Sequence, residues 1–354
     1  MELNNIVSPF LLLFFGYLFS KYFLLIIKKS KSDLLSDNQF QKPQAFHQNS
    51  TYRLGGLIIF SLLILVFLYL YVSKNIFFSE YISFCTLFFL LGFVDDLKID
   101  IKPKFRLFIM ILFLIFLVIY NKFSIERISL EYLDHLIKID IFALFFVCLC
   151  FLFIINGSNL IDGFNGLLSI HSLIILCILF YVNLVNKNYD LAYLLFYIIL
   201  IILIFVKFNF PKAQMFLGDG GAYLLGTLTS ISAIITNNLT PLVSSFFFCI
   251  LLFYLFFEVF FSFFRKIFFV GQNPLLPDNQ HLHMLVYRLL LKKNKKNLDS
   301  NYKTSIYINL IYLLLIIPGF IFMHNGLFCR YYFLSLLIIY IYIYRKLKRR
   351  GRGA

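Results

Sequence analysis

Four carboxylates of this chain lie where apolar segments begin or end. Asp95 and Asp96 close one apolar run, and Asp162 follows another. Asp219 stands between glycines where a further run begins. A charged group beside apolar segments is costly unless it is hydrated, paired or bound to a cation, and an aspartate at a helix start can simply cap that helix. Because carboxylates are also preferred ligands of Mg²⁺, the alternative is a divalent-metal or proton-accepting site.

A polar stretch at 156–166 interrupts the apolar pattern without a single Lys or Arg. It supplies one hydroxyl, the Asp162 carboxylate and the amides of Asn156, Asn159 and Asn165. Its glycines would let backbone N–H groups approach a ligand closely, and its carboxylate could bind a metal. The stretch therefore predicts a tight polar loop at the membrane surface that binds a ligand, with an ordinary turn as the alternative.

Two histidines, His281 and His283, lie in the longest polar connection, residues 265–304. Two histidines without further ligands are weak evidence for zinc. Arg265 and Arg288 belong to the same connection, and guanidinium groups suit phosphate oxygens. Carboxylates for Mg²⁺ that face cations for phosphate are the equipment of phosphoryl transfer, in which positioning and charge neutralisation provide most of the catalysis.

The composition requires a lipid environment for the elements that hold these residues. Of the 354 residues, 61% are hydrophobic and 14% are charged, whereas a soluble globular protein has about 45–50% apolar and about 25% charged residues. A soluble fold could not bury so much apolar surface. The net charge of +15 falls in short segments between apolar runs, so it indicates orientation in a membrane and no nucleic-acid partner.

Apolar runs of spanning length predict an all-α polytopic membrane protein with about eleven transmembrane helices, or about ten if two neighbouring runs form one. We find no fixed repeat and no polar segment long enough for a soluble domain, so a single membrane domain is expected over residues 1–354. The predicted spans are roughly 6–27, 54–73, 76–94, 106–121, 139–155, 166–186, 190–207, 222–237, 241–264, 305–323 and 327–344.

The basic residues are distributed unevenly between the two ends of these spans. About 25 of the 32 Lys and Arg lie in alternate connections. The positive-inside rule places those connections in the cytosol, the N-terminus outside and the basic tail 345–354 inside. All the polar motifs belong to the cytosolic set, so the sequence predicts a site on the cytosolic face.

Taken in order, these motifs resemble those of the polyprenyl-phosphate N-acetylhexosamine-1-phosphate transferases. The motifs are Gly-x-x-Asp-Asp, Asn-x-x-Asn-x-x-Asp-Gly-x-x-Gly-Leu, Phe-x-Gly-Asp-x-Gly and Pro-Asp-x-x-His-Leu-His. His47, Arg53, Lys104 and Arg106 extend the match, which covers about residues 37–290. Four motifs in the same order are far more specific than any one of them.

The resemblance implies that a UDP-N-acetylhexosamine gives its sugar-1-phosphate to undecaprenyl phosphate, with UMP and a diphosphate-linked lipid as products. It implies a requirement for Mg²⁺, with Mn²⁺ as a candidate substitute. The location it implies is the bacterial cytoplasmic (inner) membrane, in a multi-pass arrangement with the active site facing the cytosol. The expected partners are the nucleotide sugar, the lipid phosphate and the bilayer, with a second copy of the chain as a candidate partner in a homodimer.

The histidine motif is closer to members that start O-antigen, capsule or teichoic-acid chains. The peptidoglycan phospho-N-acetylmuramoyl-pentapeptide transferases are the alternative within the family. A secondary transporter is the alternative from a different class, but such folds usually show inverted repeats and sites near the bilayer midplane.

The resemblance also gives each candidate residue a role by position. Asp95 and Asp96 match an acidic pair that deprotonates or positions the lipid phosphate. Asp219 matches the aspartate that binds Mg²⁺, with Asp95 as a second candidate ligand. The catalytic set is Asp95, Asp96, Asp162 and Asp219. The substrate-binding set is His47, Lys104, Arg106, Asn156, Asn159, Asn165, Arg265, His281 and His283.

Three positions depart from the family pattern. Met284 stands where the histidine motif often has another histidine. Asn165 stands where many members carry an aspartate near the nucleotide base, and Glu258 lies near a common aspartate of the ninth apolar run. These departures bear on the nucleotide and sugar contacts more than on the chemistry.

Overall fold

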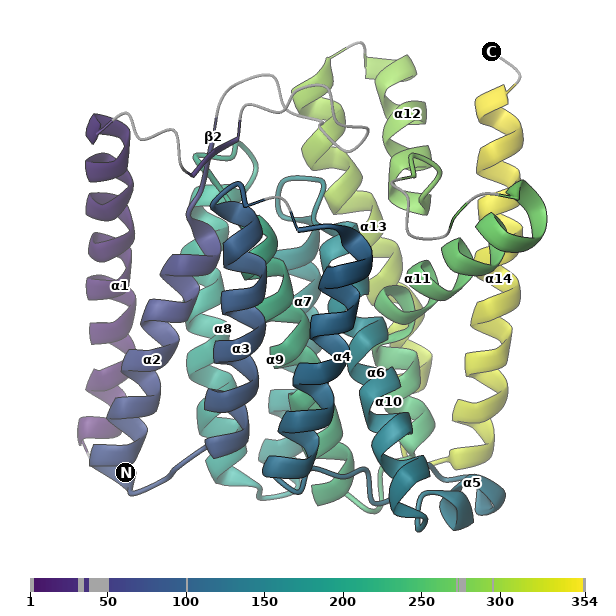
Figure 1. The fold of residues 1–354 in the computed structure, drawn as a ribbon, viewed down its shortest axis with the longest axis horizontal. Helices are drawn as coiled ribbons and strands as arrows, with labels where there is room; N and C mark the ends of the chain where they lie inside the picture. Colours follow the sequence, from purple (N-terminus) through teal and green to yellow (C-terminus); the bar gives the residue numbers. More distant parts are fainter. Residues whose placement is uncertain are drawn as a thin grey trace.

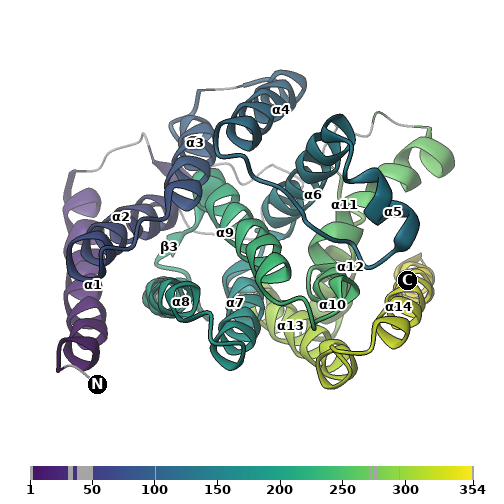
Figure 2. The same ribbon diagram turned by 90° about the horizontal axis from the view of Figure 1, so that it is seen from below.

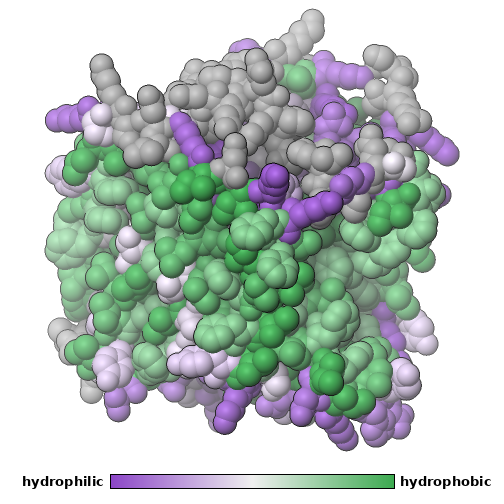
Figure 3. Space-filling view, in the orientation of Figure 1, coloured by the Kyte–Doolittle hydropathy of each residue, from purple (hydrophilic) through white to green (hydrophobic). Residues whose placement is uncertain are grey.

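The computed structural model describes residues 3–30, 35–37, 51–99, 101–271, 273, 278–294 and 296–352. This part of the chain is a bundle of long helices that run side by side between two polar ends (Figure 1). Hydrophobic side chains form a broad middle band on the surface, and hydrophilic ones gather at both ends (Figure 3). Such a band suits the hydrocarbon layer of a bilayer, as the composition predicts.

The helices follow one another with short connections. They are α1 (Leu3–Ser30), α2 (Gly55–Lys74), α3 (Ser79–Asp96), α4 (Pro103–Tyr120), α5 (Glu131–Leu136), α6 (Asp140–Ile161), α7 (Leu167–Val185), α8 (Tyr189–Asn209), α9 (Gly218–Leu239), α10 (Ser245–Leu251), α11 (Phe253–Arg265), a π-helical turn (Lys266–Val270), α12 (Leu282–Asn294), α13 (Asn297–Ile321) and α14 (Gly326–Arg352).

Eight helices within the described ranges are long and apolar enough to cross a membrane, or nine spans if α10 and α11 count as one. Every predicted apolar run coincides with a helix or with that pair. Neither α3, which carries three acidic residues, nor α9, which is rich in Gly, Ser and Thr, is among the eight. The multi-pass helical class is thus confirmed, whereas about eleven spans stays a prediction.

The helix ends sort the polar motifs onto one end of the bundle. α3, α6 and α8 finish, and α4, α7 and α9 begin, at the end where α14 also finishes (Figure 1). The first turn of α1 lies at the opposite end. The predicted grouping of Asp95, Asp96, Asp162 and Asp219 at one end is therefore what the fold produces.

The predicted span 241–264 is not a straight helix. It breaks at Leu252 into α10 and α11, which meet at an angle of 71°. The hydroxyl of Tyr312 on α13 donates to the Leu251 carbonyl beside the break. A backbone carbonyl released from a helix inside a membrane protein needs such a partner, so the hydrogen bond from α13 stabilises the bend. Beyond the bend, α11 leaves the bundle obliquely (Figure 1).

A small sheet adds to the predicted all-α architecture at the same end as the polar motifs. Its strands are β1 (Ser36–Asp37), β2 (Thr51–Arg53) and β3 (Met215–Phe216), and β2 pairs antiparallel to β1 and parallel to β3. Arg53 lies opposite Phe216, and the Gly56 N–H donates to the Leu217 carbonyl at 2.8 Å. The sheet thereby fixes Arg53 beside the start of α9.

α9 lies in the middle of the bundle, with α3 and α6 to one side and α7 and α8 to the other (Figure 2). Its small residues let neighbouring backbones approach closely. A β-carbon at Gly92 of α3 would lie 2.5 Å from the Asp219 carbonyl carbon, and one at Gly220 would lie 3.0 Å from the Phe93 nitrogen. This close contact brings the end of α3 against the start of α9.

Substitution of Gly92 by Ala should therefore destabilise the fold. The added methyl group meets backbone atoms, which cannot swing away as a side chain can, and such overpacking costs about 1–3 kcal/mol. Thermal unfolding in detergent should show a lower midpoint for Gly92→Ala. Gly326→Ala is the matched control, because the nearest atom to its β-carbon is the Ser244 hydroxyl at 3.8 Å. Equal midpoints for the two variants would contradict the packing argument.

Candidate active site

Asp96 joins the end of α3 to the start of α9. Its two carboxylate oxygens accept hydrogen bonds from the backbone N–H groups of Asp219 and Gly220, each at 2.9 Å. The first N–H groups of a helix have no partner inside it and carry partial positive charge. A guanidinium nitrogen of Arg53 lies 3.4 Å from the same carboxylate. Asp96 is thus held by three groups and only 3% exposed.

Asp95 faces the neighbouring helix instead. Its carboxylate pairs with the Arg106 guanidinium of α4 at 2.5 Å, and that guanidinium also lies over the Tyr223 ring of α9, 5.8 Å from the ring centre. Arg106 therefore bridges α3 and α9 while it neutralises Asp95. The buried hydroxyl of Tyr223 has no hydrogen-bond partner in the described part of the chain.

Asp162 and Asp219 carry the charge that remains uncompensated. Both side chains are half-buried, and neither makes a hydrogen bond or ion pair with the described residues. Burial and the nearby carboxylates of Asp219 and Asp96 raise the pKa of Asp162 to about 8. Burial and Asp219 likewise raise the pKa of Asp96 to about 7, against the opposing effect of the two N–H groups and Arg53. The site therefore concentrates negative charge that a cation would relieve.

The donor set fits Mg²⁺ better than a metal that needs an all-protein cage. No group of three or more His, Cys, Asp or Glu side chains is arranged to hold a metal within the described ranges. Mg²⁺ commonly uses one or two carboxylates together with waters and substrate phosphates. Asp219 and Asp162 supply that number of carboxylates without an ion-pair partner among the described residues, whereas Asp95, the second predicted candidate, is paired with Arg106.

The polar stretch 156–166 is only partly a loop. α6 continues through Ile161, so the predicted loop begins at Asp162. In this last part of the helix the Asn156 amide donates to the Leu152 carbonyl one turn earlier, and Gly157 packs against the Leu255 carbonyl of α11. Asn159 is half-buried, and its side chain makes no hydrogen bond with the described residues.

Asn165 and Gly166 anchor the true loop to its neighbours. The Asn165 N–H donates to the Asn301 side chain at 2.8 Å, and its amide donates to the Pro211 carbonyl at 3.0 Å. Gly166, with a φ of 76°, donates its N–H to Asn209 at 2.7 Å. Asn165 thus holds the loop in place through both groups, and Gly166 supplies a backbone conformation that side chains disfavour.

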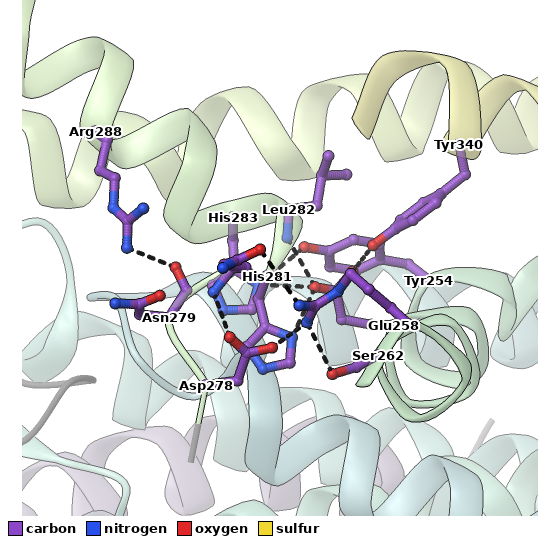
Figure 4. Close-up of polar contacts among 12 residues, drawn as sticks. Tyr254, Glu258, Ser262, Asp278, Asn279, His281, Leu282, His283, Arg288 and Tyr340 are labelled. Carbon is purple, nitrogen blue, oxygen red and sulfur yellow. Dashed lines mark hydrogen bonds and ion pairs between the residues drawn. The ribbon is translucent and has the colours of Figure 1, made fainter. Parts of the chain in front are cut away.

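The segment that carries the two histidines, residues 278–283 (the histidine segment), packs against the buried carboxylate of Glu258 (Figure 4). His281 Nδ1 lies 3.2 Å from a Glu258 oxygen, the Leu282 N–H donates to the same oxygen at 2.8 Å, and the Tyr340 hydroxyl donates to the other. His283 Nδ1 lies 3.2 Å from the Tyr254 hydroxyl. Both predicted histidines are therefore built into the wall formed by α11, α12 and α14.

The predicted cations have different surroundings. The Arg265 side chain pairs with Asp278, and both are largely buried. This pair holds the Asp278 pKa below its usual range, so the charge of Arg265 is already balanced. Lys104 is exposed in the first turn of α4. His47 lies outside the described residues.

Aromatic contacts connect the histidine segment to the loop that carries Asp162. The Phe164 ring packs edge-on against the His283 ring at 5.8 Å and against Tyr287 of α12 at 5.1 Å. The start of α12 therefore lies on the loop between α6 and α7. The fold brings the four aspartates and Arg106 to one end of the bundle and connects His283 to them through Phe164.

The predicted site residues do not include Glu258, Tyr340 or Asp278, although Glu258 stands out in the sequence as a departure from the family pattern. A signal existed for Glu258, because it is an acid in an apolar run, where an unpaired carboxylate is expensive. Asp278 stands in the histidine motif itself. Tyr340 gave no signal, because tyrosine is common throughout this chain.

The helix bundle and its polar end define a class, a multi-pass membrane protein whose candidate catalytic residues meet at one surface. The model of glycosyl transferase family 4 matches residues 78–237. An undecaprenyl-phosphate alpha-N-acetylglucosaminyl 1-phosphate transferase of Thermotoga maritima is 29% identical over 71% of this chain and 70% of its own length. A phospho-N-acetylmuramoyl-pentapeptide-transferase of Dictyoglomus thermophilum is 34% identical over 62% of this chain and 71% of its own. The chain therefore belongs to glycosyl transferase family 4 and is a transferase.

Substitution of Asp96 or Asp219 by Asn should show that the first carboxylate stabilises the fold and the second does not. At position 96 the new NH₂ group faces a backbone N–H that needs an acceptor, and a buried unsatisfied donor costs about 1–3 kcal/mol. At position 219 no described donor depends on the carboxylate, and one negative charge leaves a crowded site. Metal-free thermal unfolding should show a lower midpoint for Asp96→Asn and an unchanged or higher one for Asp219→Asn. The reverse order would refute this division.

Proposed function

We propose that this protein transfers an N-acetylhexosamine-1-phosphate from a UDP-sugar to undecaprenyl phosphate and releases UMP. The observation that carries the proposal is a pair of neighbouring carboxylates, Asp162 and Asp219, that have no hydrogen-bond or ion-pair partner among the described residues. They lie at one end of a membrane bundle, where a water-soluble nucleotide can meet a lipid phosphate. The product would be the diphosphate-linked lipid that begins a cell-envelope polysaccharide.

The residues of the chain divide the work of this reaction. Asp219 and Asp162 would hold Mg²⁺, and a bound Mg²⁺ would supply neutralisation of the phosphate charge. Asp96 keeps the start of α9, and with it Asp219, in position through its two N–H contacts. Arg106 fixes Asp95 beside the entering lipid phosphate. Asn159, Lys104 and the histidine segment are the remaining groups for nucleotide and diphosphate contacts.

The names of the relatives suggest two candidate donor sugars. The Thermotoga maritima relative is named for N-acetylglucosaminyl 1-phosphate, and the Dictyoglomus thermophilum relative is named for phospho-N-acetylmuramoyl-pentapeptide. We favour the unmodified N-acetylhexosamine because of the Pro-Asp-x-x-His-Leu-His motif. The pentapeptide-bearing sugar is the second candidate, supported by the 34% identity to the Dictyoglomus thermophilum protein.

The orientation of the site follows from the distribution of charge. The four aspartates lie where helices end or begin at one end of the bundle, and the set of alternate connections to which they belong carries about 25 of the 32 Lys and Arg of the sequence. The positive-inside rule assigns such an end to the cytosol. The proposal therefore places the active site on the cytosolic face of the bacterial cytoplasmic membrane, where nucleotide sugars are made.

Substitution of Asp219 by Asn should abolish metal binding and slow turnover strongly. Release of UMP should fall by about 10²–10³-fold, as for the loss of one electrostatic contact in other enzymes. Mg²⁺ should raise the thermal midpoint of the wild-type protein, because a ligand at 100 times its Kd stabilises by about 2.7 kcal/mol, and should leave Asp219→Asn unchanged. Asp190→Asn, an exposed acid at the opposite end of the bundle, is the matched control. Wild-type rates in Asp219→Asn would refute the assignment.

The donor sugar can be identified directly. Purified protein should be given undecaprenyl phosphate, Mg²⁺ and, one at a time, UDP-N-acetylglucosamine, UDP-N-acetylgalactosamine and UDP-N-acetylmuramoyl-pentapeptide. We expect mass spectrometry to show a diphosphate-linked lipid with one of the two N-acetylhexosamines, and none of that product when EDTA is present. A product with the pentapeptide donor alone would select the second candidate, and no product with any donor would overturn the proposed function.

A further inference from the structure

Glu258 is a buried carboxylate with a complete set of donors. It is 1% exposed on α11, where a carboxylate is costly unless it is hydrogen-bonded. One oxygen, Oε1, accepts from the Leu282 N–H at 2.8 Å and lies 3.2 Å from His281 Nδ1. The other oxygen accepts from the Tyr340 hydroxyl of α14. These contacts tie together α11, the start of α12 and α14 (Figure 4).

This arrangement determines which nitrogen of His281 carries the proton. An ionised carboxylate only accepts hydrogen bonds. The Leu282 N–H has a fixed proton directed at Oε1, so Oε1 is an acceptor at that position. His281 Nδ1 shares the same oxygen and must therefore be its protonated nitrogen. In the neutral imidazole the lone pair then lies on Nε2.

The two histidines differ in what lies at Nδ1. His283 Nδ1 lies 3.2 Å from the Tyr254 hydroxyl, its Nε2 is sealed from solvent without a partner in the described part of the chain, and burial lowers the pKa of this histidine to about 3. His281 Nδ1 is held by Glu258, the side chain is 3% exposed, and its Nε2 makes no hydrogen bond with the described residues. Nε2 of His281 is thus left for a ligand, whereas His283 packs as a neutral ring against Phe164.

We propose that Glu258 is a positioning residue for the sugar-phosphate transfer, because it holds His281 with the proton on Nδ1 and presents Nε2 to the diphosphate of the substrate. The proposal rests on the proposed function for the identity of the substrate, but the contacts of Glu258 do not. Through Tyr340, the same contacts make α14 part of the support of the site. Glu258 is distinct from the four aspartates, which act at the metal end of the same site.

Kinetics of a double-mutant cycle test this role. Glu258→Ala and His281→Ala should each lower kcat by about 10²-fold, the lower range for a group that handles a proton or a charge in the reaction. The double variant should be no slower than His281→Ala alone, because residues that act as one unit are non-additive. Losses that multiply in the double variant, or a wild-type kcat in Glu258→Ala, would overturn the proposal.

Glu258→Gln is the matched variant in case Glu258→Ala fails to fold. Its amide oxygen can accept from Leu282 and His281, and its NH₂ group can donate to the Tyr340 oxygen. The contacts of residue 258 with Leu282, His281 and Tyr340 can therefore all form although the negative charge of the carboxylate is gone. We expect kcat of Glu258→Gln to stay within about tenfold of wild type, since geometry and not charge is the claimed contribution. A loss as large as that of His281→Ala would contradict the claim.

A spectroscopic measurement separates this proposal from the proposed function. Nitrogen-15 NMR of histidine-labelled protein without substrate, with His281→Ala to assign the signal, should show protonated Nδ1 and unprotonated Nε2 in wild type and in Glu258→Gln. Glu258→Ala should show a mixture of tautomers. An unchanged signal in Glu258→Ala would refute the positioning role. If wild-type protein turns over no UDP-sugar, the proposed function fails, and these spectra still decide whether Glu258 sets the tautomer.

Discussion

The carboxylate of Asp96 at the start of α9 is the contact on which the rest of this site depends. A membrane helix that begins inside the protein leaves backbone N–H groups without partners, and Asp96 supplies acceptors for two of them. Because Asp219 is one of those two residues, the same contact sets where the Asp219 side chain lies. Asp95, the preceding residue on α3, then faces α4 and Arg106.

This contact is possible only because α3 and α9 approach more closely than most helices do. Gly92 and Gly220 remove the β-carbons that would separate the two backbones. The remainder of α9 offers Thr227, Thr229 and Ser230, whose hydroxyls bond to carbonyls of their own helix. A helix of this kind is too polar to face lipid but suits a position surrounded by other helices, and its central place in the bundle follows from that.

The sequence predicts the parts of this structure that depend on local pattern. Apolar runs locate the helices, and charge in alternate connections groups the four aspartates at one end. The bend at Leu252, the continuation of α6 past Asn156 and the contacts of Glu258 depend on partners far along the chain, such as Tyr312 and Tyr340. No local pattern contains those partners. Asn165 shows the same limit, because its side-chain amide donates to the Pro211 carbonyl and its backbone N–H donates to the Asn301 side chain, both far along the chain.

The four aspartates differ in how far the fold has neutralised them. Asp95 and Asp96 have an arginine or N–H groups as partners, whereas Asp162 and Asp219 have none among the described residues. Uncompensated like charges destabilise a fold. Capping does not explain the other two aspartates, because Asp96 already accepts from the N–H groups at the start of α9. Protonation relieves part of this electrostatic cost, as the raised pKa of Asp162 shows, and a bound cation would relieve it without loss of the carboxylate charge. Under the proposed function, relief of that repulsion contributes to binding the metal, and through the metal to binding the phosphates between which the reaction takes place.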